Sequence, residues 1–135
     1  MKVRMNELRG ITAELHSTLR EHGMQDSDQL LEVGRTLAGR KELASKTGAD
    51  PKHILELVNR ADLARIKGIG SAYSNLLEEA GVDTVKELAT RRPDNLFAKL
   101  IEVNTAKKLV GRTPTLEMVQ DWVSPAKELP KLVEY

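Results

Sequence analysis

The chain has 135 residues, of which 40% are hydrophobic and 30% are charged, which fits an ordinary globular domain and excludes a disordered or fibrous protein. It has no cysteine, which excludes iron-sulfur clusters and cysteine-ligated zinc, and its 21 Lys and Arg nearly balance 20 Asp and Glu. No apolar run approaches the ~20 residues of a membrane span, and the start MKVRMNELR lacks the apolar stretch of a secretory signal. We therefore expect a cytoplasmic protein with no membrane partner.

The residue types favour helices over strands. Only 3% of the residues are aromatic, and the abundant Leu, Ala, Glu, Lys and Arg lose little side-chain freedom in a helix. Glycines and prolines divide the chain into short segments, which predicts an all-α fold of about eight or nine helices of about ten residues each.

Capping patterns place two of these helices. Asp50 followed by Pro51 is typical of an N-cap and a first helical residue, because proline lacks an amide that is unbonded there anyway, and it predicts a helix over 51–60. Thr84 with Glu87 predicts a capping box, in which each side chain bonds the free amide of the other residue.

Two further helices follow in the second half. Pro93 begins a segment whose apolar residues share one stripe, and a similar stripe that contains Trp122 predicts a helix over 115–127. Within that stripe Trp122 is expected to be a core anchor rather than a platform for stacking bases. Pro130 should stop the helix and leave KLVEY as an extended or frayed tail.

The chain contains an internal repeat. Residues 8–31 align with residues 66–89 at an offset of 58. The matched positions are turn glycines and apolar residues: Gly10 with Gly68, Ile11 with Ile69, Leu19 with Leu77, and Gly23 with Gly81. We therefore divide the chain into similar halves, 1–60 and 61–135, the second including the last helix and a short tail, and expect them to pack around a shared core as one compact unit.

The segment IKGIGSAYSNLLEEAGV resembles the helix-hairpin-helix motif, in which a glycine-hydrophobic-glycine turn joins two short helices. Glycines suit this turn because they reach positive φ and let another backbone approach, while Ile69 would point into the core. The resemblance implies that amides of the turn and of the next helix N-terminus hold a nucleic-acid phosphate, sometimes with a bound cation. The alternative is that the motif only joins two helices.

A second resemblance covers nearly the whole chain. The strings VNRADLARIKGIG, LLEEAGVDTVKELATRRPDNL, EVNTAKKLVGRTP and DWVSPAKELP, in this order, are similar to a bacterial family of unknown function built from a helix-hairpin-helix repeat. It implies two tandem repeats related by a pseudo-two-fold and implies no activity. Unlike that family, the first turn has Thr12 in place of a second glycine, and Thr12 is a candidate N-cap that would make this turn structural.

Basic residues near the turns and in one later segment are the candidate phosphate contacts. Residues 91–112 contain six Lys and Arg against two Asp and Glu, a net charge of +4. The alternative, which we favour, is a solvated helix face with positive charges at a helix C-terminus, where the helix dipole favours them. The candidate nucleic-acid contacts are Arg9, Gly10, Arg65, Lys67, Gly68, Ile69, Gly70, Ser71, Lys107 and Lys108. Against contact, the helix after the second turn begins without a basic residue and continues to Glu78 and Glu79.

The other sequence patterns give weaker evidence of a function. KELASKTGADPKHILELV has the spacing of a helix-turn-helix, but its second helix offers only Lys52, His53, Asn59 and Arg60 to DNA, and two packed helices give the same pattern. His16 and His22 lie six residues apart on different helix faces, so we expect no metal site. Catalytic signatures are missing as well, and we expect neither an enzyme nor a cofactor.

These observations predict weak, sequence-independent binding of DNA or RNA through backbone phosphates. The alternative is a protein-interaction or scaffold module, favoured by the nearly neutral charge and the acidic helix after the second turn. A continuous positive face joining Lys67, Lys107 and Lys108 would favour nucleic acid, whereas a large exposed apolar patch would favour a protein partner.

Overall fold

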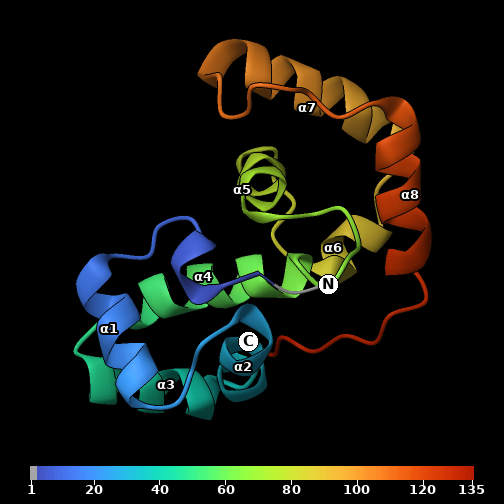
Figure 1. Ribbon diagram of the computed structural model, residues 1–135. Helices are drawn as coiled ribbons and strands as arrows, with labels where there is room; N and C mark the ends of the chain where they lie inside the picture. Colours follow the sequence, from blue (N-terminus) through green and yellow to red (C-terminus); the bar gives the residue numbers. More distant parts are fainter. Residues whose placement is uncertain (1–2) are drawn as a thin grey trace.

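A computed structural model describes residues 3–135, and this part of the chain is all-helical, with eight α-helices, one short 3-10 helix (η1) and no strand (Figure 1). The all-α class is therefore confirmed. In chain order the elements are η1 Met5–Glu7, α1 Ala13–Glu21, α2 Ser27–Gly34, α3 Leu37–Thr47, α4 Pro51–Leu63, α5 Ser71–Glu79, α6 Val85–Ala89, α7 Pro93–Lys107 and α8 Leu116–Ala126.

The predicted caps form where the sequence places them. Asp50 accepts a hydrogen bond from the Lys52 amide at 2.9 Å, and α4 runs on to Leu63, three residues beyond the predicted helix end. Thr84 accepts from the Glu87 amide at 3.2 Å, but the Glu87 carboxylate accepts from Arg91 instead of returning a bond to Thr84. One half of the predicted capping box is therefore present.

The two aligned segments have matching backbone geometry. α1 and α5 begin and end at residues that differ by 58. The paired turn glycines have nearly equal φ, 86° at Gly10 and 93° at Gly68, then 84° at Gly23 and 92° at Gly81. The repeated sequence thus produces the same turn, helix and turn twice.

The buried apolar residues form two clusters, not the single shared core that the repeat predicts. The first combines residues of η1 and α1–α4 with Val133, and the second runs from Leu63 to Ala126. Between the clusters, the end of α4 buries the polar side chains of Asn59, Arg60 and Asp62. Such groups need hydrogen-bond partners when buried, so they interrupt apolar packing here.

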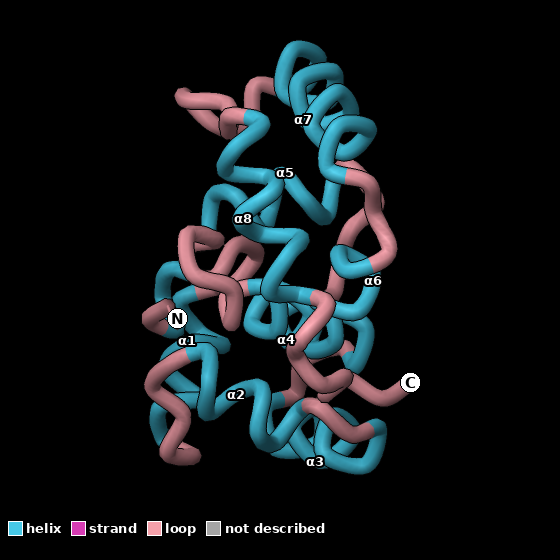
Figure 2. The backbone as a smooth tube through the Cα atoms, turned by 90° about the vertical axis from the view of Figure 1, so that its right-hand side faces the viewer, coloured by secondary structure: helices cyan, strands magenta, loops and turns pink. Residues whose placement is uncertain are grey.

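The two clusters give the molecule a long shape. α1–α3 surround α4 at one end, and α5–α8 form the other, with α3 and α7 far apart in both views (Figures 1 and 2). α4 packs against α2, α3 and α5 and so joins the halves.

The tail after α8 is extended and packed, so of the two predicted forms, extended or frayed, the extended one is observed. It runs back from α8 to the first half, and its end lies beside α2 (Figure 1). Val133 is buried in the first cluster, the Glu134 amide donates to the Arg35 carbonyl at 2.7 Å, and Arg40 donates to the Glu134 carbonyl.

Candidate functional site

The turn at residues 66–70 joins α4 to α5 and is held from inside. Ile69 is fully buried, as expected for the apolar residue of such a turn, and its amide donates to the Ile66 carbonyl at 3.1 Å. At Gly68 an added Cβ would lie 3.1 Å from Nε1 of Trp122, so the indole packs directly on the backbone here. Lys67 is exposed beside this fixed turn.

The N-terminus of α5 lacks a side-chain cap. Gly70 occupies the N-cap position and has no side chain to accept from the first-turn amides. These amides, including those of Ser71 and Ala72, have no carbonyl partner within their own helix. With the positive end of the helix dipole they form the kind of donor set that binds anions.

At the corresponding first turn, around Gly10, side chains occupy the groups that a phosphate would contact. Thr12 accepts from the Leu15 amide at 3.1 Å and so occupies the N-terminus of α1, as its predicted capping role requires. The ring of His53 donates from Nε2 to the Gly10 carbonyl at 2.7 Å, and Nη1 of Arg60 lies 3.4 Å from the position of a Cβ on Gly10. Side chains of α4 therefore cover this turn, although Arg9 beside it is exposed.

Two of the candidate cations have intramolecular partners. Arg65 pairs with Asp62 at 2.7 Å and donates to the Pro130 carbonyl at 3.0 Å, and only 12% of its side chain is exposed. Lys107 pairs with Glu79 at the C-terminal end of α5. Since α5 is about 12 Å long, Lys107 lies well away from the N-terminal end of that helix.

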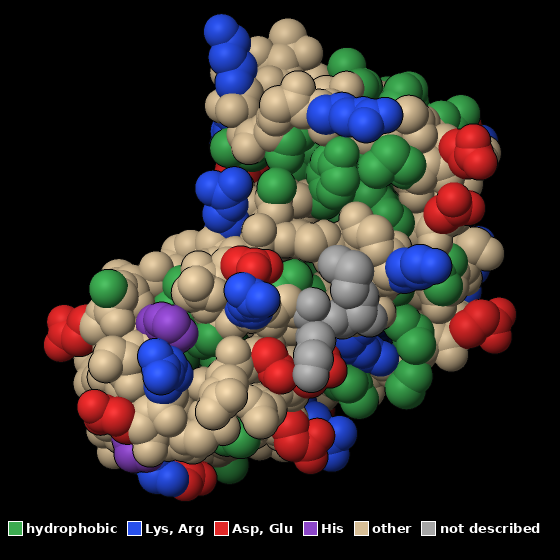
Figure 3. Space-filling model, in the orientation of Figure 1, with side chains coloured by type: hydrophobic (Ala, Val, Ile, Leu, Met, Phe, Trp, Pro, Cys, Tyr) green, Lys and Arg blue, Asp and Glu red, His purple; other side chains and the backbone are tan. Residues whose placement is uncertain are grey.

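The remaining candidate cations in the second half, Lys67 and Lys108, are exposed. Lys108 is exposed at the C-cap of α7, where its φ is 53°. On the face shown in Figure 3, basic and acidic side chains are interspersed. Of the three lysines expected on a continuous positive face, Lys107 is thus paired with an acidic residue, Glu79.

The backbone of one basic residue that our site prediction omitted lies against α5. Tyr73, in the first turn of α5, donates its hydroxyl to the Arg112 carbonyl at 3.0 Å, and its ring centroid lies 5.2 Å from that of Trp122. The loop after α7 is thereby held against the start of α5, with Arg112 exposed. Sequence reasoning included Arg112 in the basic segment 91–112, but nothing local indicates that this loop folds back on α5.

The helix-turn-helix pattern corresponds to α3 and α4. Ile54 and Leu57 of α4 are fully buried, and Asn59 and Arg60 are buried as well. Of the four residues that this helix would offer to DNA, Asn59 and Arg60 are therefore buried and His53 bonds the Gly10 carbonyl, which leaves Lys52 exposed. The alternative, two packed helices, is the arrangement observed.

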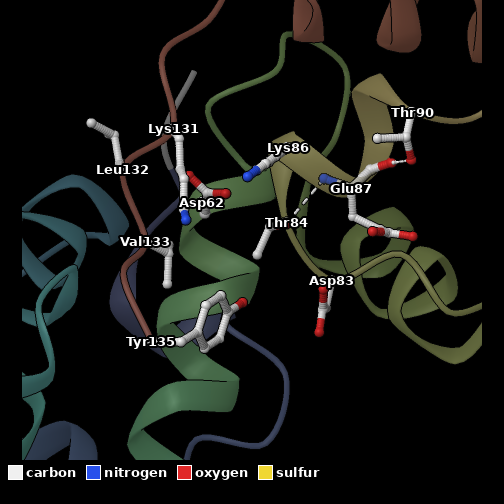
Figure 4. Close-up of a pocket in the computed structure, with 10 residues that line it drawn as sticks. All are labelled: Asp62, Asp83, Thr84, Lys86, Glu87, Thr90, Lys131, Leu132, Val133 and Tyr135. Carbon is white, nitrogen blue, oxygen red and sulfur yellow. Dashed lines mark hydrogen bonds between the residues drawn. The ribbon is translucent and has the colours of Figure 1, made fainter.

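A pocket of 340 Å³ lies between the tail and α6. Figure 4 shows ten of the residues that line it, with Tyr135 and Lys131 of the tail facing Asp83, Thr84 and Lys86. The buried Asp62 carboxylate is already used, because it accepts from the Val85 amide at 2.8 Å and pairs with Arg65.

Tyr135 of the pocket also makes a contact with α4. Burial, followed by the charges of Asp83 and Asp62, raises the pKa of the Tyr135 hydroxyl, which donates to Asn59 at 3.3 Å. In the described part of the chain, no three His, Cys, Asp or Glu side chains gather as metal ligands.

An ion pair links α4 to α5 beside the closed first turn. Nη2 of Arg60 lies 2.8 Å from Oε2 of Glu78, and both side chains are mostly buried. Burial raises the pKa of Glu78, and Arg60 opposes this effect. The nearby carboxylates of Glu56, Asp83 and Glu79 raise it further.

Comparison with known proteins gives one match. The family model described as a domain of unknown function (DUF4332) matches residues 9–129. No curated protein and no solved structure matches the chain. Among residues 3–135, no helix is long and apolar enough to cross a membrane.

Proposed function

The chain belongs to the family described as a domain of unknown function (DUF4332), and for this member we propose weak, sequence-independent binding of nucleic acid through backbone phosphates. The observation that carries the proposal is the uncapped N-terminus of α5 beside exposed Lys67. In this proposal residues 8–31 and 66–89 are two helix-hairpin-helix units in tandem, and the protein acts in the cytoplasm without catalysis.

The second turn alone is assigned to phosphate. The first-turn amides of α5 and the exposed Lys67 offer backbone donors and one positive charge to one phosphate group. The Tyr73 hydroxyl holds the backbone of Arg112, a further exposed cation, against α5. The first turn has Thr12 on its helix N-terminus and His53 on its carbonyl, so it is assigned an architectural role.

The binding test is fluorescence anisotropy of labelled single-stranded and double-stranded DNA and RNA, titrated with the full chain at two salt concentrations. If this one phosphate is neutralised, the affinity for duplex DNA should fall about threefold between roughly 50 mM and 200 mM salt. Binding that does not change with salt would contradict the phosphate mechanism.

Two substitutions test the contact itself. Lys67→Glu should weaken binding, whereas Lys127→Glu, at the exposed C-cap of α8, should not. Ser71→Pro removes one amide at the first position of α5, where proline is compatible with a helix, and should weaken binding about tenfold.

The matched control for the amide is Leu116→Pro at the first position of α8, which should leave binding unchanged. Equal affinity of the wild type, Lys67→Glu and Ser71→Pro would refute the site. Failure of every probe to bind at low salt would transfer the proposal to the alternative, a protein-interaction module with architectural turns.

A further inference from the structure

We propose that a groove between α3 and α4 binds an acidic amphipathic segment of a partner protein. This inference uses residues other than those of the phosphate site. It rests on an apolar pocket, on the charges that surround it and on the way in which the tail completes it.

The groove is formed by one face of each helix. α3 and α4 pack against each other, and the pocket between them has a volume of 310 Å³. On α3 it is lined by Leu37, Arg40 and Lys41, whose spacing of three and four residues puts them on one face. On α4 the lining residues Pro51, Lys52 and Leu55 have the same spacing.

Large apolar side chains of this groove face solvent. Leu37 is 49% exposed and Tyr135 is 66% exposed, the highest values among the large hydrophobic residues described as exposed. Leu55 beside them is half-buried. A concave, apolar lining that is exposed to solvent is typical of a site that binds an apolar side chain of a partner.

The charged residues that line the groove are all basic, whereas the whole chain has almost equal numbers of acidic and basic residues. Lys41 and Lys52 are exposed at its edges. An occupant with carboxylates beside its apolar residues therefore matches this groove in charge.

Arg40 holds one wall of the groove in place. Its guanidinium donates to the Gly34 carbonyl at 2.9 Å, the Arg35 carbonyl at 3.2 Å and the Glu134 carbonyl, and its Cζ lies 6.0 Å from the centroid of the Tyr135 ring. The tail therefore presents Tyr135 to the groove in a fixed position. Such a preformed site lowers the entropy cost of binding.

The apolar lining favours a peptide over a nucleic acid. A phosphate backbone would have to lie over Leu37 and Leu55, which offer it no hydrogen bond, and over Tyr135, whose hydroxyl already donates to Asn59. A groove between two helices instead suits an amphipathic helix that inserts apolar residues at helical spacing and keeps its carboxylates near the lysines.

The test is fluorescence anisotropy with the full chain and a fluorescein-labelled helical peptide of about 15 residues that has Leu along one face and Glu elsewhere. Two matched peptides have Lys in place of Glu, or Ser in place of Leu. The Leu and Glu peptide should bind, and each matched peptide should bind at least about tenfold more weakly.

Variants then locate the binding. Leu37→Ser and Lys41→Glu should each weaken binding of the Leu and Glu peptide about tenfold. Leu116→Ser, which changes a leucine that is 38% exposed on α8, and Lys127→Glu are the matched controls and should have no effect. Leu37 and Lys41 are exposed, so circular dichroism should show an unchanged fold for their variants.

Three results would overturn the proposal. They are no binding of the Leu and Glu peptide, equal binding of the peptide with Lys, and full binding by Leu37→Ser. Displacement of the peptide by unlabelled DNA, lost in Lys41→Glu, would instead assign the groove to nucleic acid. Because this test uses Leu37 and Lys41 while the phosphate test uses Lys67 and Ser71, each proposal fails separately.

Discussion

At Gly68, backbone geometry and a close aromatic contact coincide. The φ of 93° disfavours any side chain, and an added Cβ would lie 3.1 Å from Trp122. Gly48 has a φ of 75° with open space around it, so a substitution there measures the energetic cost of the positive φ alone. We expect Gly48→Ala to lower the free energy of unfolding by about 1 kcal/mol and Gly68→Ala to lower it by about 2 kcal/mol or more.

Urea unfolding of both glycine variants measures the difference. A larger decrease in the free energy of unfolding for Gly68→Ala than for Gly48→Ala would show that the Trp122 contact holds the second turn in place. Equal losses at the two positions would mean that the indole moves aside without cost.

Glu78 makes stability depend on pH. Burial raises its pKa in the folded protein, so between its unfolded and folded pKa values the native state binds more protons than the unfolded state. This group therefore adds stability below its unfolded pKa and loses it as pH rises through the folded pKa. Glu78→Gln removes that titration.

The measurement is urea unfolding of the wild type and Glu78→Gln from pH 4 to pH 7. We expect the wild type to lose stability relative to Glu78→Gln as pH rises. A difference between the two proteins that stays constant across this range would show that the pKa of Glu78 is not raised on folding.

At the scale of elements, the tail after α8 connects the second half of the molecule to the first. Val133 is 2% exposed in the first cluster, whereas Leu129, earlier in the tail, is 36% exposed. Val133→Ala removes buried carbon and should lower the free energy of unfolding by about 1–2 kcal/mol. Leu129→Ala should change it by less than about 0.5 kcal/mol.

Chemical unfolding of the two tail variants tests this assignment. Equal stability of Val133→Ala and the wild type would mean that the tail is not packed in solution. The same docked tail orients Tyr135, so its loss would also remove one wall of the α3 and α4 groove.

At the scale of the whole molecule, α4 couples two apolar clusters. Its residues Ile54 and Leu57 belong to the first cluster and Leu63 belongs to the second. Because α4 contributes buried residues to both clusters, we expect a single cooperative transition. Trp122 is the one tryptophan of the chain, and it reports on the second cluster.

Leu19→Ala tests this coupling from the first cluster. Leu19 is fully buried, so the change should cost about 3 kcal/mol, and the Trp122 fluorescence transition should move to lower urea together with the loss of helical circular dichroism. An unmoved fluorescence transition would show that the halves unfold independently.

The sequence by itself determined the features that depend on neighbouring residues. The helical class, the caps at Asp50 and Thr84 and the turn glycines at an offset of 58 were all predictable. The physical reason is locality, since a cap bonds an amide two or three residues ahead and a positive φ is a property of one residue.

Tertiary structure decided the rest, because a charged or apolar residue carries no mark of its distant partner. Arg65 donates to the Pro130 carbonyl, Lys107 pairs with Glu79, and the tail packs on the first half. The division into two clusters likewise arose where α4 must satisfy buried polar groups from both sides. Which cations stay free for a partner follows from these long-range contacts, since ion pairs and burial are settled only when segments far apart in the chain meet.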